Sequence, residues 1–302
     1  MKYSPKLKVL CIDRLAIALI ALFFTLFIFS CKKEDTKPAT PAITETEAAE
    51  YSAESMEAEA SFDDIQDISM TAADEEGIVS AGRAEGLRPF PFLRLRLRIG
   101  ANAVITVTPD DNTYPKTVTI DFGQGEVCPD GKFRKGKIVL HFTGPIRKPG
   151  SVVTITLVEF QVGRVRVEGT KVITNLSENG NIKFSVLVTD GKVIYPNGRN
   201  YKYEKLKYVK QVAGSATDEI SDDVYSIEGY SKATFKNGVV IAISTKEALI
   251  KKVNCAWISE GILNVKVGDY EFSLDYGIPG NGDCDDKALL KWNSYEKIIL
   301  LP

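Results

Sequence analysis

From residue 116 onward, apolar residues alternate with polar residues in one run after another, and this two-residue period constrains the fold more than any other feature. Successive side chains of a strand point to opposite faces, so the period predicts strands with one buried and one solvated face. One solvated face favours antiparallel pairing. The apolar sets are Val118, Ile120 and Phe122; Ile138, Leu140 and Phe142; Val165 and Val167; Ile182, Phe184, Val186 and Val188; Leu263, Val265 and Val267.

Turn-forming residues separate these runs at the short intervals that hairpins require. They are Pro109-Asp110-Asp111-Asn112, Pro149-Gly150, Asn179-Gly180-Asn181, Asp190-Gly191, Pro196-Asn197-Gly198, Asn237-Gly238 and Val267-Gly268-Asp269. We therefore expect an all-β domain over residues 87–302, an antiparallel β-meander arranged as a sandwich or a half-barrel. A polar gap at residues 214–223 suggests a division into two similar halves.

Two segments of this domain are candidates for a ligand-binding face. Leu93, Leu95, Leu97 and Ile99 alternate with arginines, which predicts another strand, and Tyr201 and Tyr203 open a stretch rich in Tyr and Lys. The candidate residues are Arg94, Arg96, Arg98, Tyr201 and Tyr203, which would suit an anionic glycan. The alternative is that edge strands carry charge to block aggregation. A net charge of +6 over residues 87–302 is too modest to predict nucleic-acid binding.

The N-terminus has the organisation of a signal peptide. Basic residues from Lys2 to Arg14 precede an apolar run of about 15 residues from Leu15 to Phe29. That run is short for a membrane span, which needs roughly 20 residues. We predict that residues 1–30 are a signal peptide, with an uncleaved anchor as the alternative.

The apolar run ends at Ile28-Phe29-Ser30-Cys31, which resembles the lipobox of bacterial lipoproteins. The resemblance implies cleavage before Cys31 and diacylation of its thiol. The residues Lys33, Glu34 and Asp35 follow, and they resemble the surface-export signal of Bacteroidota lipoproteins. This likeness implies an outer-membrane lipid anchor and exposure at the cell surface.

Residues 31–86 differ sharply from the rest of the chain in charge. Residues 32–86 contain 15 acidic and 4 basic residues, a net charge of −11. We predict an acidic tether with a marginal helix over 44–68 and a disordered stretch through Gly77 to Gly86. Within the helix a thin stripe of Tyr51, Ser55, Ala58, Phe62 and Ile65 would dock weakly on the basic domain or stay solvated.

Two loops share a pattern in which a strand ends in Asp-aromatic-Gly and a Cys and acidic residues follow. They begin at Asp121-Phe122-Gly123 and at Asp275-Tyr276-Gly277. With Cys255-Ala256-Trp257-Ile258, they make residues 116–302 resemble a Bacteroidota lipoprotein family of unassigned function. The resemblance implies no activity.

The cysteines of the mature domain are Cys128, Cys255 and Cys284, and export favours their oxidation. We expect a Cys255–Cys284 or a Cys128–Cys284 disulfide, with three buried thiols as the alternative. No metal site is predicted, because Cys-x-x-Cys is absent and His141 is the single histidine. Asp283, Asp285 and Asp286 with Asn281 do not continue as a calcium-binding EF-hand loop.

Catalytic arrangements are weak. Asp121 and Asp275 could form a carboxylate pair for glycoside hydrolysis, but each is better explained as a strand-ending residue that binds turn amides. His141 lies mid-strand, where a sheet-surface histidine is the simpler interpretation. We therefore predict a non-enzymatic binding or envelope-interaction domain without cofactors. The alternatives are a surface glycan-binding protein, for which Trp257 or Trp292 would line a groove, and a carboxylate-based hydrolase.

Overall fold

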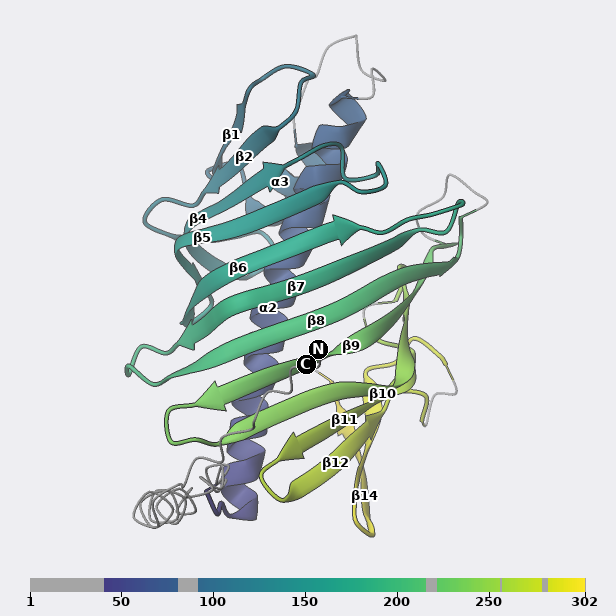
Figure 1. Ribbon diagram of the computed structural model, residues 1–302. Helices are drawn as coiled ribbons and strands as arrows, with labels where there is room; N and C mark the ends of the chain where they lie inside the picture. The colour runs from purple at the N-terminus through teal and green to yellow at the C-terminus, as the bar shows by residue number, and fades with distance from the viewer. Residues whose placement is uncertain (1–40, 81–91, 216–221, 256, 279–281, 302) are drawn as a thin grey trace, which may run out of the picture. The chain divides into compact units, whose positions relative to one another are not determined.

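The computed structural model describes residues 41–80, 92–215, 222–255, 257–278 and 282–301, which belong to one unit spanning Thr40–Pro302 (Figure 1). The predicted signal peptide, the lipidation residue Cys31 and the export residues Lys33, Glu34 and Asp35 lie outside the described residues. The same is true of residues 81–86 of the predicted tether.

Two helices precede the strands, and all the described strands belong to one sheet. The helices are α2 (Glu45–Ser80) and α3 (Leu93–Ile99). The strands are β1 (Val104–Thr108), β2 (Lys116–Asp121), β3 (Glu126–Val127), β4 (Phe133–Phe142), β5 (Val152–Val162), β6 (Val165–Asn175), β7 (Lys183–Ile194), β8 (Asn200–Ala213), β9 (Val224–Phe235), β10 (Val240–Lys252), β11 (Glu260–Val267), β12 (Tyr270–Asp275), β13 (Lys287–Trp292) and β14 (Tyr295–Leu300).

Each strand pairs antiparallel with the next one in the chain, except that β2 pairs with β4 and not with the short β3, which pairs with another part of β4. The prediction of an all-β antiparallel meander is therefore confirmed, and it takes the form of one open 14-stranded sheet. The predicted division near residues 214–223 falls between β8 and β9. These two strands pair with each other within the one sheet, with Gln211 opposite Tyr225.

β-bulges interrupt the pairing at several places, and a bulge bends the strand that carries it. The predicted turn at Asp190-Gly191 is one of them: it lies inside β7, where the register with β8 shifts. Asp190 has a φ of 52°, and a Cβ on Gly169 of β6 would lie 2.7 Å from the Cα of Gly191. Glycines are therefore required where β6 and β7 approach each other most closely.

Helix α2 begins with a capping box. The Thr44 hydroxyl accepts a hydrogen bond from the backbone N–H of Glu47 at 3.3 Å, and the Glu47 carboxylate accepts one from the Thr44 N–H at 2.8 Å. The helix then continues to Ser80, twelve residues beyond the predicted end at 68, so Gly77–Ser80 are helical instead of disordered. Ala72 and Ala73 are buried in this extension, and their packing explains the extra turns.

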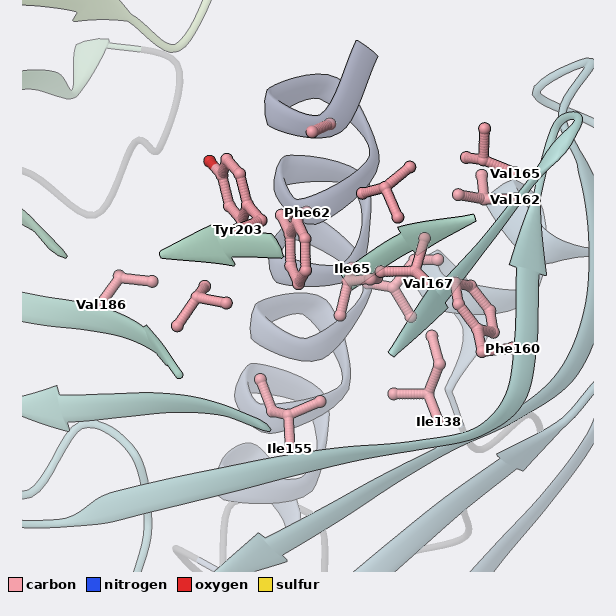
Figure 2. Packing of buried hydrophobic residues seen from close by; sticks show 14 of the residues in the cluster. Phe62, Ile65, Ile138, Ile155, Phe160, Val162, Val165, Val167, Val186 and Tyr203 are labelled. Carbon is pink, nitrogen blue, oxygen red and sulfur yellow. The ribbon is translucent and has the colours of Figure 1, made fainter. Parts of the chain in front are cut away.

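Figure 1 shows α2 running across the strands behind the sheet, so it is part of the folded domain and not a spacer. Of the predicted stripe, Ser55, Ala58, Phe62 and Ile65 are buried. Phe62 stacks on Tyr203 of β8 with ring centroids 4.6 Å apart. Figure 2 shows Phe62 and Ile65 pointing from α2 into the buried cluster that the strands supply.

Carboxylates along α2 meet cations that project from the inner face of the sheet. The ion pairs between α2 and the strands or their connecting loops include Glu54–Arg199, Glu57–Arg164, Glu59–Lys205, Asp63–Lys205, Asp63–Lys207, Asp64–Lys132, Asp64–Arg134, Asp74–Arg147 and Glu76–Lys116. The predicted docking of an acidic helix on a basic face is thus present, but several of the charges are buried.

Arg134 of β4 is the most deeply buried of these cations, with 0% of its side chain exposed. Its guanidinium donates to both carboxylate oxygens of Asp64, at 2.9 and 2.7 Å, and to both of Asp130, at 2.8 and 2.6 Å. Burial alone would raise the pKa of Asp64, but Arg134 outweighs it and holds this pKa below its usual value. Both carboxylates are therefore held ionised.

The prediction of a strand over residues 93–99 is wrong, because this segment is helix α3. Leu and Arg are strong helix formers, and the segment lacks β-branched residues before its last position. Leu95 and Ile99, four residues apart, are buried, whereas Leu93 and Leu97 are 49% and 69% exposed. The Glu75 carboxylate accepts hydrogen bonds from the first backbone amides of α3, those of Arg94 and Leu95.

Among the described residues, no helix is long and apolar enough to cross a membrane.

Shortening a buried side chain in the apolar stripe of α2 should destabilise the domain. We expect Ile65→Ala to lower the free energy of unfolding by about 2–5 kcal/mol, because it leaves a cavity in the core. Leu97→Ala, at an exposed helical position, should change it by less than about 0.5 kcal/mol. Urea denaturation checks both values. Equal effects would mean that α2 does not share the core of the sheet.

The Asp64–Arg134 pair should make stability depend on acid. A carboxyl group whose folded pKa is lowered stabilises the fold above its unfolded pKa of about 3.9, and this contribution is lost as the pH falls through the folded value. Asp64→Asn should lower the free energy of unfolding near pH 7 by about 3 kcal/mol, the lower end for a broken buried pair because Asp130 still neutralises Arg134.

Below about pH 4 the Asp64→Asn variant should lose stability less steeply than the unsubstituted protein. Denaturation curves recorded between pH 7 and pH 2 measure both slopes. Asp269→Asn, at an exposed turn position, is the matched control. Parallel curves for all three proteins would contradict the assignment.

Candidate functional site

A cavity of about 400 Å³ lies between the N-terminal half of α2 and the inner face of the sheet. Helix α2 contributes Met56, Glu59, Ala60 and Asp63 to its wall. The opposite wall comes from β8 to β11, from the segment after β10 and from the C-terminal Leu301. Its volume falls within the range of about 300–1,000 Å³ that is usual for small-molecule sites.

Irregular pairing of β10 makes room for this cavity. The register between β10 and β9 shifts between Ser244 and Leu249, and the register between β10 and β11 shifts twice beyond Thr245. In the gap, the hydroxyl of Thr245 accepts a hydrogen bond at 3.0 Å from the backbone N–H of Gly229. The bulged strand therefore bends here and leaves space beside the helix.

The walls of the cavity are mainly apolar. The apolar and aromatic side chains that line it include Met56, Ile227, Ile243, Leu249, Trp257, Ile258, Leu263, Tyr276 and Leu301. Tyr276 is buried, and burial raises its pKa to about 12. Trp257 is half-buried.

Three lysines line the same cavity, and each ammonium group is held by oxygen atoms of the protein. Lys205 donates to Asp63 at 2.9 Å and to Glu59, and Lys207 donates to Asp63 at 2.8 Å. Lys251 donates to the backbone carbonyl of Cys255 at 2.5 Å. Burial lowers the pKa of Lys205, but Asp63 and Glu59 more than offset this effect and raise it.

A disulfide joins the segment after β10 to the segment before β13. Cys255 and Cys284 are bonded, with their Cα atoms 5.3 Å apart, whereas Cys128 is a free and buried thiol. This is one of the two pairings considered from the sequence. The bond lies two residues from Trp257 and therefore ties one wall of the cavity to the end of the sheet.

The candidate ligand face is not formed. Tyr201 and Tyr203 lie under α2, with 2% and 0% of their surface exposed. The Tyr201 hydroxyl donates to the backbone carbonyl of Glu54 at 2.6 Å. Both residues belong to the inner face of β8, and the aromatic run was mistaken for a surface because its buried partner, α2, was expected to be a tether.

The arginines of α3 are also engaged within the protein. Arg98 pairs with Asp64, Asp67 and Asp130, and Arg96 donates to the backbone carbonyls of Ala101 and Ala103. Arg94 lies 3.7 Å from Glu75. These contacts serve the docking of α3, and the helix turns Arg96 away from Arg94 and Arg98, which are four residues apart.

Asp121 and Asp275 both bind turn amides, as the simpler interpretation of the sequence predicts. Asp121 accepts a hydrogen bond from the N–H of Gly123 at 2.8 Å, and Asp275 accepts one from Gly277 at 3.1 Å. Asp121 also pairs with Lys137, which helps to hold its pKa below the usual value. His141 is exposed on β4, 3.3 Å from the hydroxyl of Thr117.

The predicted acidic loop also serves a turn, since Asp285 accepts a hydrogen bond from the N–H of Lys287 at 2.8 Å. Asn281 lies outside the described residues. Within the part of the chain that the structure describes, no group of three or more His, Cys, Asp or Glu side chains could hold a metal ion.

Sequence reasoning missed the cavity residues of α2 and β8. Glu59 and Asp63 were counted as charges of a tether, and Lys205 and Lys207 as a surface run. One signal was available: Lys205 and Lys207 continue the same strand face as Tyr201 and Tyr203.

Comparison with known proteins found that no family model, no curated protein and no solved structure matches this chain.

Proposed function

We propose that this chain is a lipid-anchored protein of the bacterial envelope, exposed at the cell surface, whose β-rich domain is a non-enzymatic binding module. The observation that carries the binding role is the apolar cavity between α2 and strands β8 to β11. It combines a suitable volume with a mainly apolar wall, a disulfide-bonded margin and a few fixed polar groups, which is the usual composition of a ligand site.

The membrane anchor is supported by the sequence. A basic and apolar leader ends at Ser30-Cys31, and diacylation of Cys31 would supply about 0.8 kcal/mol for each buried methylene group. Lys33, Glu34 and Asp35 support transport to the outer surface. The partners that fit this location are the membrane, through the lipid, and an extracellular glycan, small molecule or envelope protein.

The chemistry of the cavity supports binding without catalysis. Its described wall contains two carboxylates, Glu59 and Asp63, and both neutralise lysines. Asp121 and Asp275, the residues that a carboxylate-based hydrolase would need, bind the amides of their own turns. No observation favours the hydrolase.

One observation favours glycan binding as a second candidate function. Trp257 is half-buried in the cavity wall, where its ring could stack on a sugar. Trp292 instead packs against Tyr270, with ring centroids 5.9 Å apart. The aliphatic side chains around Trp257 offer few hydrogen bonds to a sugar, so the cavity wall favours an apolar ligand over a glycan.

Affinity electrophoresis through gels that contain cell-surface polysaccharides separates these candidates. We expect the protein, Trp257→Ala and Trp292→Ala to migrate alike, because the preferred ligand is apolar. Retardation of the unsubstituted protein that falls about tenfold in Trp257→Ala alone would establish the glycan function instead.

Metabolic labelling with an alkyne analogue of palmitate tests the anchor. We expect Cys31→Ser to lose the label and leave the membrane fraction, because the acylated thiol is gone. Cys11→Ser, within the leader, should keep both the label and the membrane location. Labelling that survives in Cys31→Ser would contradict the anchor.

Protease treatment of intact cells then tests whether the domain is exposed at the cell surface. The strain is the one that produces Cys11→Ser, which keeps the anchor, and the protein carries a C-terminal tag. We expect loss of the full-length protein while periplasmic and cytoplasmic control proteins stay intact. Protection of a domain that the same protease cleaves in lysed cells would show that it faces inward.

A further inference from the structure

We propose that the cavity between α2 and strands β8 to β11 takes an uncharged ligand with a long apolar chain, such as a long-chain alcohol or an acylglycerol, and discriminates against the matching carboxylate. The inference rests on the proposed binding function but is independent of the lipid anchor. It follows from how the wall distributes apolar surface and charge.

The apolar surface accounts for affinity. Aliphatic side chains face the space from both sides, Met56 from α2 and Ile227, Ile243, Leu249 and Leu263 from the strands. Removing an apolar chain from water contributes roughly 25 cal/mol for each Å² buried. A chain lying along this wall would be stabilised over its length without any specific polar contact.

The charge distribution accounts for selectivity. A fatty acid in this space would need a cation, but Lys205 is bound by Glu59 and Asp63, and Lys207 by Asp63. Lys251 donates to the uncharged backbone carbonyl of Cys255, and burial lowers the pKa of this lysine, which disfavours its charged form. A carboxylate that enters beside Lys205 or Lys207 would meet the charges of Glu59 and Asp63 and would have to displace one of them. Such repulsion is the usual way to reject a competitor of the same shape.

A neutral hydroxyl group would find hydrogen-bond partners in this wall. The hydroxyl groups of Thr245 and Tyr276 line the cavity. Such groups can donate to or accept from an alcohol without leaving a charge buried. The site thus suits a molecule whose polar end is small and uncharged.

Photoaffinity labelling in native membranes tests the proposal on the full chain. The probes are a long-chain alcohol and a fatty acid of equal length, each with a diazirine and an alkyne. Labelled peptides are mapped by mass spectrometry and normalised to total membrane labelling. We expect the alcohol to label peptides from 56–63 and 227–263 at least about fivefold more than the acid.

Three variants make the test specific. Ala60→Trp places a large ring in the cavity and should reduce labelling by the alcohol about tenfold. Ala53→Trp, at an exposed position two turns away on α2 and outside the cavity wall, should leave it unchanged. Glu59→Gln removes one carboxylate from Lys205 and should raise labelling by the acid, relative to the alcohol, about tenfold.

The outcomes separate the two proposals. Equal labelling by both probes, or no gain for the acid in Glu59→Gln, overturns the charge selectivity and leaves the binding function standing. Absence of cavity labelling by either probe overturns both. Circular dichroism would show whether Ala60→Trp fails to fold. In that case Glu59→Gln still tests the charge selectivity, because a gain in labelling by the acid cannot result from unfolding.

Discussion

The rest of the structure depends on the neutralisation of the sheet's buried cations by helix α2. The side chains of Lys116, Arg134, Lys171 and Lys205 are buried, and an isolated charge at such a position would cost far more than the fold could supply. Helix α2 brings carboxylates to Lys116, Arg134 and Lys205. Lys171 receives only the backbone carbonyl of Phe62, at 2.5 Å, and burial lowers its pKa well below the usual value. The apolar stripe of the helix supplies driving force, whereas these pairs fix its register along the sheet.

Because α2 depends on these contacts with distant strands, most of the sheet could be predicted from the sequence, but the helix only in part. Every alternating run after residue 116 is a strand, because period-two burial needs only one covered face. The helix was predicted at its start, where the capping box at Thr44 is a local signal. Its last twelve residues are stabilised by contacts with strands that lie far away in the sequence, and no local signal reports them.

Helix α3 was misread for a related reason. Alternation of Leu and Arg satisfies the period of a strand, but Leu95 and Ile99 also satisfy the i, i+4 spacing of a helix, and Leu93 and Leu97 are left in solvent. In such a short segment, the helix propensity of Leu and Arg and the hydrogen bonds from the first backbone amides to Glu75 favour the helix over the strand. The same limit applies to the cavity: Trp257 was recognised as a candidate, but a bulge in β10 is not encoded by any single residue type.

The position of α2 in the chain has a consequence for synthesis. It precedes every strand, and its Asp63 pairs with a lysine 142 residues further along. When α2 leaves the ribosome, neither the cations that neutralise it nor the strands that cover Phe62 exist. Hairpins of the sheet can form from neighbouring residues, but the helix has to remain in water until β8 is made. Its high negative charge, which is matched by cations in the finished domain, keeps the exposed stripe soluble during that interval.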